Sequence, residues 1–231
     1  MSWTVAATGY WDRHVIDFVE RFVTPGTLVL DVGASLGLWA VPLGQIVRRH
    51  GGLLWCFEPN PENIPWLTWN IEANDLRRVA EVHPVAVGAR EGTVHLGLRE
   101  PGGGNGAITL DVGNDEDVAV EVKRIDDYTF PCPVSFVKID VEGFELEVIR
   151  GMWTLLERDR PVILGEFNAT WLSRRKEDLP AGLRRLAAIG YDIFALEQRR
   201  SARWRPNDVA TLRSLRSPFA TTAEDLVLIP S

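Results

Sequence analysis

The chain has 231 residues, of which 45% are hydrophobic, 9% aromatic and 25% charged, and its formal net charge is −7. This composition is typical of a folded globular protein with a full core, and it excludes a disordered or fibrous chain. An acidic chain is repelled by nucleic-acid phosphates, and no apolar run has the length of a transmembrane helix. We therefore expect neither general nucleic-acid binding nor a membrane span.

The N-terminal stretch "MSWTVAATGYWDRHVIDFVERF" lacks the basic end and continuous apolar centre of a secretion signal, so we expect a cytoplasmic protein. Two cysteines, Cys56 and Cys132, are too few for a disulfide framework or a zinc cluster. We expect a single domain over residues 1–231 that opens with a helical or lid segment over residues 1–25. The number of subunits stays open, with a homodimer as one alternative.

Apolar runs typical of strands alternate with helical patterns along most of the chain, as expected of a parallel sheet flanked by helices. Strands are predicted over residues 27–33, 53–59, 79–87, 134–141, 161–168, 191–197 and 225–230. Helices, each with apolar residues at spacings of three and four, are predicted over residues 11–23, 36–50, 61–74, 143–158 and 178–189. The sequence thus predicts an α/β fold with seven main strands.

Residues 91–127 interrupt this alternation with three short runs, "GTVHLGL", "AITLDVG" and "VAVEVKRI", and no helical pattern. We expect a small antiparallel β insertion between the third and fourth main strands. Its glycine-rich loop at 102–106 and the segment 8–14 are predicted to close over a substrate, with Asn105 in contact. The alternative is a plain hairpin linker.

The stretch "LVLDVGASLG" ends the first strand with Asp31 and a turn that contains Gly33, Ser35 and Gly37. A dinucleotide fingerprint has its second glycine at the place of Ser35, where it makes room for a pyrophosphate, so NAD and FAD are disfavoured. The pattern suits a cofactor that has a ribose and an amino-acid tail but no phosphates. Tight helix packing is the structural alternative for these glycines.

The second strand delivers an acidic residue, Glu58 of "FEP", to its carboxyl end. A carboxylate at this place can accept hydrogen bonds from ribose hydroxyls. A surface or helix-capping role for Glu58 is the weaker alternative, because the apolar run "LLWCF" leads directly to the sheet edge.

The segments "LVLDVGASLG", "WCFEPNPENIPWLTWNIEAN", "VAVGAREGTVHL", "FVKIDVEGFELEVIRG" and "RPVILGEF" resemble the FkbM family of S-adenosylmethionine-dependent methyltransferases, over roughly residues 10–200. The resemblance implies the class I methyltransferase fold, a Rossmann-like sheet of seven mostly parallel strands in the order 3-2-1-4-5-7-6. It also implies O-methylation of a hydroxyl on a sugar, a glycosylated compound or a polyketide-type natural product, as in secondary-metabolite biosynthesis.

The same resemblance assigns a set of residues to S-adenosylmethionine. Asp31, Gly33 and Gly37 would lie beside its methionine part, with Ser35 where the family often has Asn, and Glu58 beside its ribose. The remaining positions implied for the cofactor are Pro59, Asn60, Ala86, Val87 and Asp140, of which Ala86 and Val87, in a loop after the third strand, would lie beside the adenine.

Acidic side chains follow the fourth and fifth strands, where the ligands of open α/β sheets bind. Asp140, Glu142 and Glu166 are candidates for removing a proton from the acceptor hydroxyl, either as a base or through a metal. Asp140, Glu166 and Asn168 offer oxygen ligands for Mg²⁺. The structural alternatives are an ion pair of Asp140 with Lys138 and a helix-opening role for Glu142.

Nine tryptophans are many for this length. Trp39 and Trp171 follow strand ends and, together with Asn168 and Asn105, are predicted to contact the acceptor, whereas Trp55, Trp66 and Trp69 are expected in the core. The basic stretch "QRRSARWRPN" at 198–207 either binds an anionic group or forms a solvated loop or a subunit contact.

Two other functions stay open beside a small-molecule O-methyltransferase. One is a nucleoside-binding or regulatory domain without catalytic activity, which the acidic residues at both strand ends disfavour. The other is a nicotinamide-dependent oxidoreductase, disfavoured by Ser35 and by the lack of a Tyr-x-x-x-Lys pair.

Overall fold

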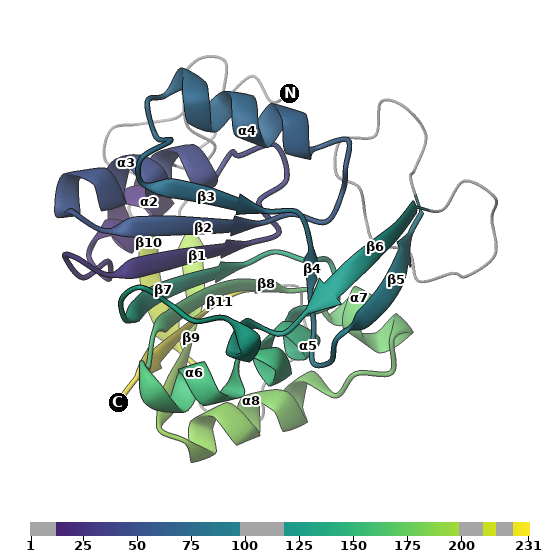
Figure 1. The fold of residues 1–231 in the computed structure, drawn as a ribbon. Helices are drawn as coiled ribbons and strands as arrows, with labels where there is room; N and C mark the ends of the chain where they lie inside the picture. Colours follow the sequence, from purple (N-terminus) through teal and green to yellow (C-terminus); the bar gives the residue numbers. More distant parts are fainter. Residues whose placement is uncertain (1–12, 98–117, 199–209, 216–223) are drawn as a thin grey trace.

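The computed structural model describes residues 13–97, 118–198, 210–215 and 224–231 (Figure 1). Four predicted features lie wholly or mainly outside these ranges: most of segment 8–14, the middle run of the insertion at 107–113, the glycine loop 102–106 with Asn105, and the basic stretch 198–207.

Eight strands form the central sheet in the order β10-β9-β11-β8-β7-β1-β2-β3 (Figure 1). Neighbours among β3, β2, β1, β7 and β8 pair in parallel, and β11 is antiparallel to both β8 and β9. The strand bounds are β1 Leu28–Val32, β2 Leu53–Phe57, β3 Ala80–His83, β7 Val134–Ile139, β8 Val162–Phe167, β9 Tyr191–Gln198, β10 Ala210–Ser214 and β11 Glu224–Pro230.

This arrangement confirms the predicted class I methyltransferase order and adds one strand. β10 pairs antiparallel with β9 at the sheet edge, so the prediction of seven main strands is one strand short. The sequence of β10, "ATLRS", holds one large apolar side chain and therefore lacks the alternation that reveals a strand.

A second sheet has the order β4-β6-β5, from β4 Ala86–Val87, β5 Gly92–Leu96 and β6 Val118–Lys123. β5 and β6 are antiparallel, which confirms the predicted β insertion between the third and fourth main strands. The single strand predicted over 79–87 is wrong, because β3 leaves the main sheet at Pro84, which lacks the N–H that a sheet ladder needs, and the chain then enters β4.

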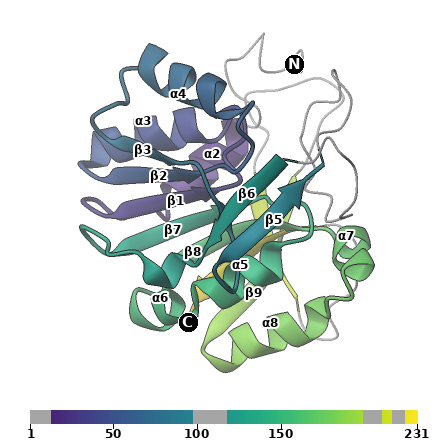
Figure 2. The same cartoon turned by 45° about the vertical axis from the view of Figure 1, so that its right-hand side comes forward.

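Helices cover both faces of the main sheet (Figures 1 and 2). On one face, α2 Arg13–Glu20, α3 Ala40–His50 and α4 Ile64–Ala73 bury a hydrophobic core that includes Val19, Ile46 and Leu67. On the other face lie α5 Glu145–Gly151, α6 Trp153–Arg158, α7 Ala169–Arg174 and α8 Leu179–Ala188, with Leu146, Leu155 and Leu183 in the second core. No helix in the described ranges has the length and apolar character to cross a membrane.

The helices differ from prediction at three places. The helix predicted over 36–50 begins at Ala40, because Gly37 still has a positive φ. The helix predicted over 143–158 begins at Glu145 and is divided at Met152, so that Glu142 lies in the preceding turn and does not open the helix. The short helix α7 was not predicted.

Two tryptophans predicted in the core lie on the surface of α4. Trp66 and Trp69 are 61% and 60% exposed, and the exposed Leu36 and Leu38 lie in the turn after β1. Asn70 Nδ2 donates a hydrogen bond of 2.7 Å to the Leu36 carbonyl, so α4 is tied to this turn. The stripe of α4 that faces the sheet uses Leu67 and Ile71, which leaves both indoles on the outer side.

Candidate functional site

The carboxyl ends of β1, β2 and β7 meet at the point where the strand order reverses, which is where open α/β sheets bind ligands. The N–H of Asp140, after β7, donates to the Val32 carbonyl of β1 at 2.9 Å. The N–H of Gly33, after β1, donates to the Phe57 carbonyl of β2 at 2.9 Å. The predicted cofactor turn and the predicted catalytic turn are therefore adjacent.

The turn after β1 has positive φ angles at Gly33 (83°), Ser35 (48°) and Gly37 (93°). A Cβ atom on Gly33 would lie 1.9 Å from the backbone oxygen of Asp140, and one on Gly37 would lie 3.1 Å from Leu67 Cδ1. Both glycines are required by the backbone conformation and by contacts within the protein. The alternative of tight packing thus explains the glycines themselves.

Glu58 is almost fully buried at the end of β2, and its carboxylate accepts three hydrogen bonds. The donors are Ser35 N–H at 2.7 Å, Asn60 N–H at 2.9 Å and Asn63 Nδ2 at 3.1 Å. Burial raises the pKa of Glu58, and these three bonds offset part of that effect. A carboxylate accepts about four bonds, so the Glu58 carboxylate has capacity for one further donor. Pro59 joins Glu58 to Asn60 in the same turn, and Asn63 was not predicted.

Asp31 and Lys138 form a buried ion pair on one face of the sheet. Asp31 is fully buried, neither of its carboxylate oxygens makes a hydrogen bond to the residues that the structure describes, and Lys138 Nζ lies 3.7 Å from Oδ1. Burial raises the pKa of Asp31 to about 6, and Lys138 opposes that rise. The Lys138 ammonium is therefore a charge partner of Asp31 that lies just beyond hydrogen-bond distance.

Lys138 also binds Asp140, with Nζ 3.1 Å from Oδ2, as the ion-pair alternative proposed. The same ammonium lies 3.5 Å from the Gly33 carbonyl and 5.8 Å from the centroid of the Trp39 ring. Burial lowers the pKa of Lys138, but Asp140 and Asp31 outweigh burial and raise it overall. Lys138 is therefore a charged ammonium that contacts both turns, while the Asp140 side chain stays 41% exposed to a ligand.

Glu166 lies in β8, directly opposite Asp225 of β11 in the antiparallel register. Like charges directly opposite one another in a sheet repel. Burial, followed by Asp140 and Asp225, raises the pKa of Glu166. Glu166 therefore adds negative charge near Asp140, and Glu142, in the turn between β7 and α5, adds more.

The three-ligand Mg²⁺ site is not supported by this geometry. Asn168 Oδ1 accepts the N–H of Trp171 at 3.3 Å, in the manner of a helix N-cap for α7. In the part of the chain that the structure describes, no three His, Cys, Asp or Glu side chains are close enough to hold a metal ion together. Trp171, predicted to contact the acceptor, stacks on the Arg174 guanidinium at 4.8 Å from the ring centroid.

The predicted position of Ala86 and Val87 in a loop is wrong. Both are buried in β4, where they pair with Val122 and Lys123 of β6. In this region the His83 carbonyl accepts the Glu58 N–H at 3.1 Å. His83 stacks on Phe57 with ring centroids 4.8 Å apart, and burial lowers its pKa, in agreement with a structural role.

One buried carboxylate, Glu145, was not predicted. It is fully buried at the first position of α5, and its Oε1 accepts the Gly143 N–H at 2.7 Å. Burial raises the pKa of Glu145 to about 7, the Gly143 bond lowers it, and Asp140 and Glu166 raise it. The spacing of Glu145 with Val148 and Ile149, three and four residues later, places it on the apolar stripe and was the available signal.

Stability is expected to fall as the pH rises from 5 to 8. The pKa of Glu145 goes from its ordinary 4.5 to about 7 in the folded protein, so the proton stabilises the fold fully below pH 4.5 and this stability is lost as the pH rises through 7. The contribution of Glu145 across this range is about 2 to 3 kcal/mol. Urea unfolding at pH 5 and pH 8 measures it, with Glu145→Gln for comparison.

Asp31 acts in the same direction, with a pKa of about 6 in the folded protein, so Glu145→Gln should reduce the slope without abolishing it. Carboxylates with a lowered pKa, such as Glu177, act below about pH 4.5 and so outside this window. Equal slopes for wild type and Glu145→Gln would contradict the assignment.

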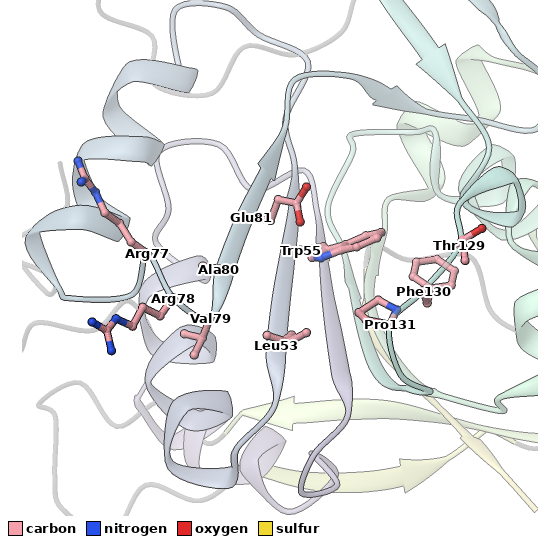
Figure 3. A pocket seen from close by; sticks show the side chains of 10 residues that line it. All are labelled: Leu53, Trp55, Arg77, Arg78, Val79, Ala80, Glu81, Thr129, Phe130 and Pro131. Carbon is pink, nitrogen blue, oxygen red and sulfur yellow. The ribbon is translucent and has the colours of Figure 1, made fainter.

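A cavity of about 530 Å³ lies elsewhere, beside β2 and β3 (Figure 3). Its walls include Leu53, Trp55 and Phe130, and the side chains of Arg77 and Arg78 point away from the two aromatic rings. Leu53 and Ala80 begin their strands, whereas Glu58 follows the opposite end of β2. This cavity contains none of the strand-end residues described above.

The chain is similar to known methyltransferases. It is 22% identical over 157 residues to Methyltransferase 1 of Beauveria bassiana (strain ARSEF 2860), covering 57% of this chain and 62% of that protein. A crystal structure of the FkbM methyltransferase from Methylobacillus flagellatus KT matches with a TM-score of 0.57 and 18% identity, over 89% of this chain and 44% of the other. This chain therefore spans less than two thirds of either relative.

A putative rRNA methylase from Clostridium thermocellum matches with a TM-score of 0.56 and 13% identity, over 96% of this chain and 95% of the other. At such identities these structures show a shared fold. The family model of the methyltransferase FkbM domain matches residues 31–193, from Asp31 at the end of β1 to the start of β9. That range is more than half of the chain and includes every strand-end residue of the site, and the chain thus belongs to the FkbM family of methyltransferases.

Proposed function

We propose that this chain transfers a methyl group from S-adenosylmethionine to a hydroxyl of a small acceptor, a sugar or a polyketide-type natural product. The observation that carries the proposal is the half-exposed Asp140, bound to Lys138 and adjacent to the Gly33 turn. A carboxylate beside a cofactor turn is where an acceptor hydroxyl needs a base.

The residues present fit the cofactor that the family implies. Glu58 has capacity for a hydrogen bond from a ribose hydroxyl, since its three protein donors leave one acceptor position. Asp31 places a buried negative charge two residues before Gly33, which suits a ligand with a cationic ammonium near that turn. When bound, S-adenosylmethionine supplies an electrophilic methyl group on a sulfonium.

The protein's own groups orient the acceptor and remove its proton. A C–O bond forms at the acceptor oxygen as the S–C bond breaks, and the hydroxyl proton passes to a carboxylate, for which Asp140 is best placed. Lys138 fixes Asp140 through the ion pair at 3.1 Å. Glu166 lies within electrostatic reach of Asp140 and is the second candidate for the proton.

The first test measures by calorimetry whether the protein binds S-adenosylhomocysteine and, separately, NAD. The second incubates the protein with S-adenosylmethionine and a panel of hydroxyl compounds, and mass spectrometry detects the gain of one methyl group. Binding of S-adenosylhomocysteine alone supports the proposal, and binding of NAD alone would overturn it. Each active reaction is repeated with chelator and with added Mg²⁺. Loss and recovery of turnover would assign a metal, and full turnover in chelator would leave the carboxylate as the base.

Replacing Glu58 with Ala is expected to weaken S-adenosylhomocysteine binding by about 1.5 to 3 kcal/mol, the contribution of the one hydrogen bond to a charged acceptor for which the Glu58 carboxylate has capacity. The Glu58 carboxylate also holds Ser35, Asn60 and Asn63, so the unfolding free energy is measured in parallel. The matched control is Glu62→Ala, an exposed carboxylate four residues away. Calorimetry that finds the same affinity for wild type and Glu58→Ala would remove Glu58 from the site.

A further inference from the structure

Glu145 is placed by a strained turn between β7 and α5. Glu142 and Gly143 have φ angles of 45° and 97°, so the chain reverses sharply after Asp140. A Cβ atom on Gly143 would lie 2.9 Å from Trp171 Cβ, which shows how closely α7 packs against this turn. The reversal carries Glu145 from the sheet edge into full burial.

The buried carboxyl of Glu145 has one oxygen satisfied and one not. Oε1 accepts the Gly143 N–H at 2.7 Å, whereas Oε2 is buried and makes no hydrogen bond to the residues that the structure describes. A neutral side chain of similar size would avoid the cost of burying this charge. Stability therefore gives no reason for an ionisable group at this position, and a buried unsatisfied group of this kind needs a functional explanation.

Three charged groups on the neighbouring segments interact electrostatically with Glu145. Asp140, after β7, and Glu166, in β8, are both negative and raise its pKa, which burial already raises to about 7. Arg175, after α7, is positive, but burial lowers its pKa. Arg175 interacts more strongly with Glu147 and Glu177 than with Glu145. Its guanidinium lies 3.3 Å from the centroid of the Phe144 ring. Glu145 thus gains or loses its negative charge inside an acidic, poorly solvated site.

We propose that Glu145 is a positioning residue whose charge makes the site prefer the sulfonium of S-adenosylmethionine over the neutral thioether of S-adenosylhomocysteine. The inference rests on the proposed function, since it requires that both molecules bind at the carboxyl ends of β1, β2 and β7. The two molecules differ by one positive charge at sulfur. An ionised Glu145 attracts that charge through a low dielectric, and a protonated Glu145 does not.

The test compares the dissociation constants of S-adenosylhomocysteine and S-adenosylmethionine by calorimetry at pH 6 and pH 8. In the wild type, the dissociation constant of S-adenosylhomocysteine divided by that of S-adenosylmethionine is expected to rise about fivefold from pH 6 to pH 8. This is the order of magnitude of one partly screened charge interaction. In Glu145→Gln, which keeps an oxygen for the Gly143 N–H, the rise of the ratio should be clearly smaller, and what remains comes from Asp31, whose pKa is about 6. The control Glu157→Gln, an exposed glutamate in α6, should behave as the wild type.

A second measurement uses the wild type alone and so does not depend on the folding of a variant. Carboxyl carbon-13 NMR of Glu145 should show a lower titration midpoint with S-adenosylmethionine bound than with S-adenosylhomocysteine, because linkage is reciprocal. Equal midpoints, or the same pH dependence of the ratio in wild type and Glu145→Gln, would overturn the inference while leaving the proposed function intact. Binding of neither molecule would instead overturn the proposed function.

Discussion

Asp140→Asn is expected to lower methyl-transfer turnover about 100-fold or more and to leave S-adenosylhomocysteine affinity close to that of the wild type. Asn keeps the shape of the side chain and removes the carboxylate that would take the acceptor's proton, and a general base contributes on the order of 10²-fold or more. Lys138 keeps its second partner, Asp31, so the buried ammonium is not left alone. Steady-state kinetics and calorimetry on the same preparation measure both quantities.

The control for Asp140→Asn is Asp192→Asn, an exposed aspartate in β9, which should keep full turnover. Glu166→Gln completes the set, because Glu166 is the other carboxylate that could accept the proton. If Asp140→Asn retained full activity, Asp140 would have no place in the mechanism. A large loss in Glu166→Gln with little loss in Asp140→Asn would transfer the role of base to Glu166.

Gly33→Ala is expected to destabilise the fold by roughly 2 to 5 kcal/mol, a large share of the total stability of a domain of this size. Two costs add up: a side chain at a φ of 83°, and a Cβ atom placed 1.9 Å from the backbone oxygen of Asp140. The obstacle is backbone in a central turn, so a rotamer change cannot relieve it. Chemical denaturation measures the loss, and a weakly folded product would itself agree with the prediction.

Two glycines separate these costs. Gly51 has a φ of 68° and no heavy atom within 4 Å of an added Cβ, so Gly51→Ala isolates the conformational cost of about 1 to 2 kcal/mol. Gly151 has no positive φ, but its Cβ would lie 2.0 Å from the Gly88 carbonyl oxygen, so Gly151→Ala isolates the steric cost. Gly33→Ala being no worse than Gly51→Ala would mean that the β1 and β7 turns separate easily.

The sequence predicts those strands of the sheet that have their own apolar pattern, and the family resemblance predicts their order. Buried parallel strands such as Leu28–Val32 and Val134–Ile139 are continuous apolar runs, and their order follows from the family resemblance. The ion pair of Lys138 with Asp140 follows from a spacing of two along one strand, which places both side chains on one face.

Other features depend on contacts between distant segments and could not be predicted. β10 is a strand because β9 offers it an edge, not because of its own composition. Trp66 and Trp69 are expected in the core, but Leu67 and Ile71 already fill the side of α4 that faces the sheet. Glu145 has a local signal in its spacing with Val148 and Ile149, but this spacing does not reveal the full burial of the carboxylate that follows the turn at Gly143.

The ammonium of Lys138 couples the charge of the cofactor side of the site to the charge of the acceptor side. It contacts Asp31 on the cofactor side and Asp140 on the acceptor side, with the Gly33 carbonyl between them. In the proposed reaction Asp140 becomes neutral when it takes the acceptor's proton, and Lys138 then has Asp31 as its one remaining carboxylate among these contacts. Each methyl transfer would thus strengthen the attraction between Lys138 and Asp31, so a reaction on the acceptor side would change the electrostatics of the cofactor side. The original ion pairs would return when water removes the proton from Asp140.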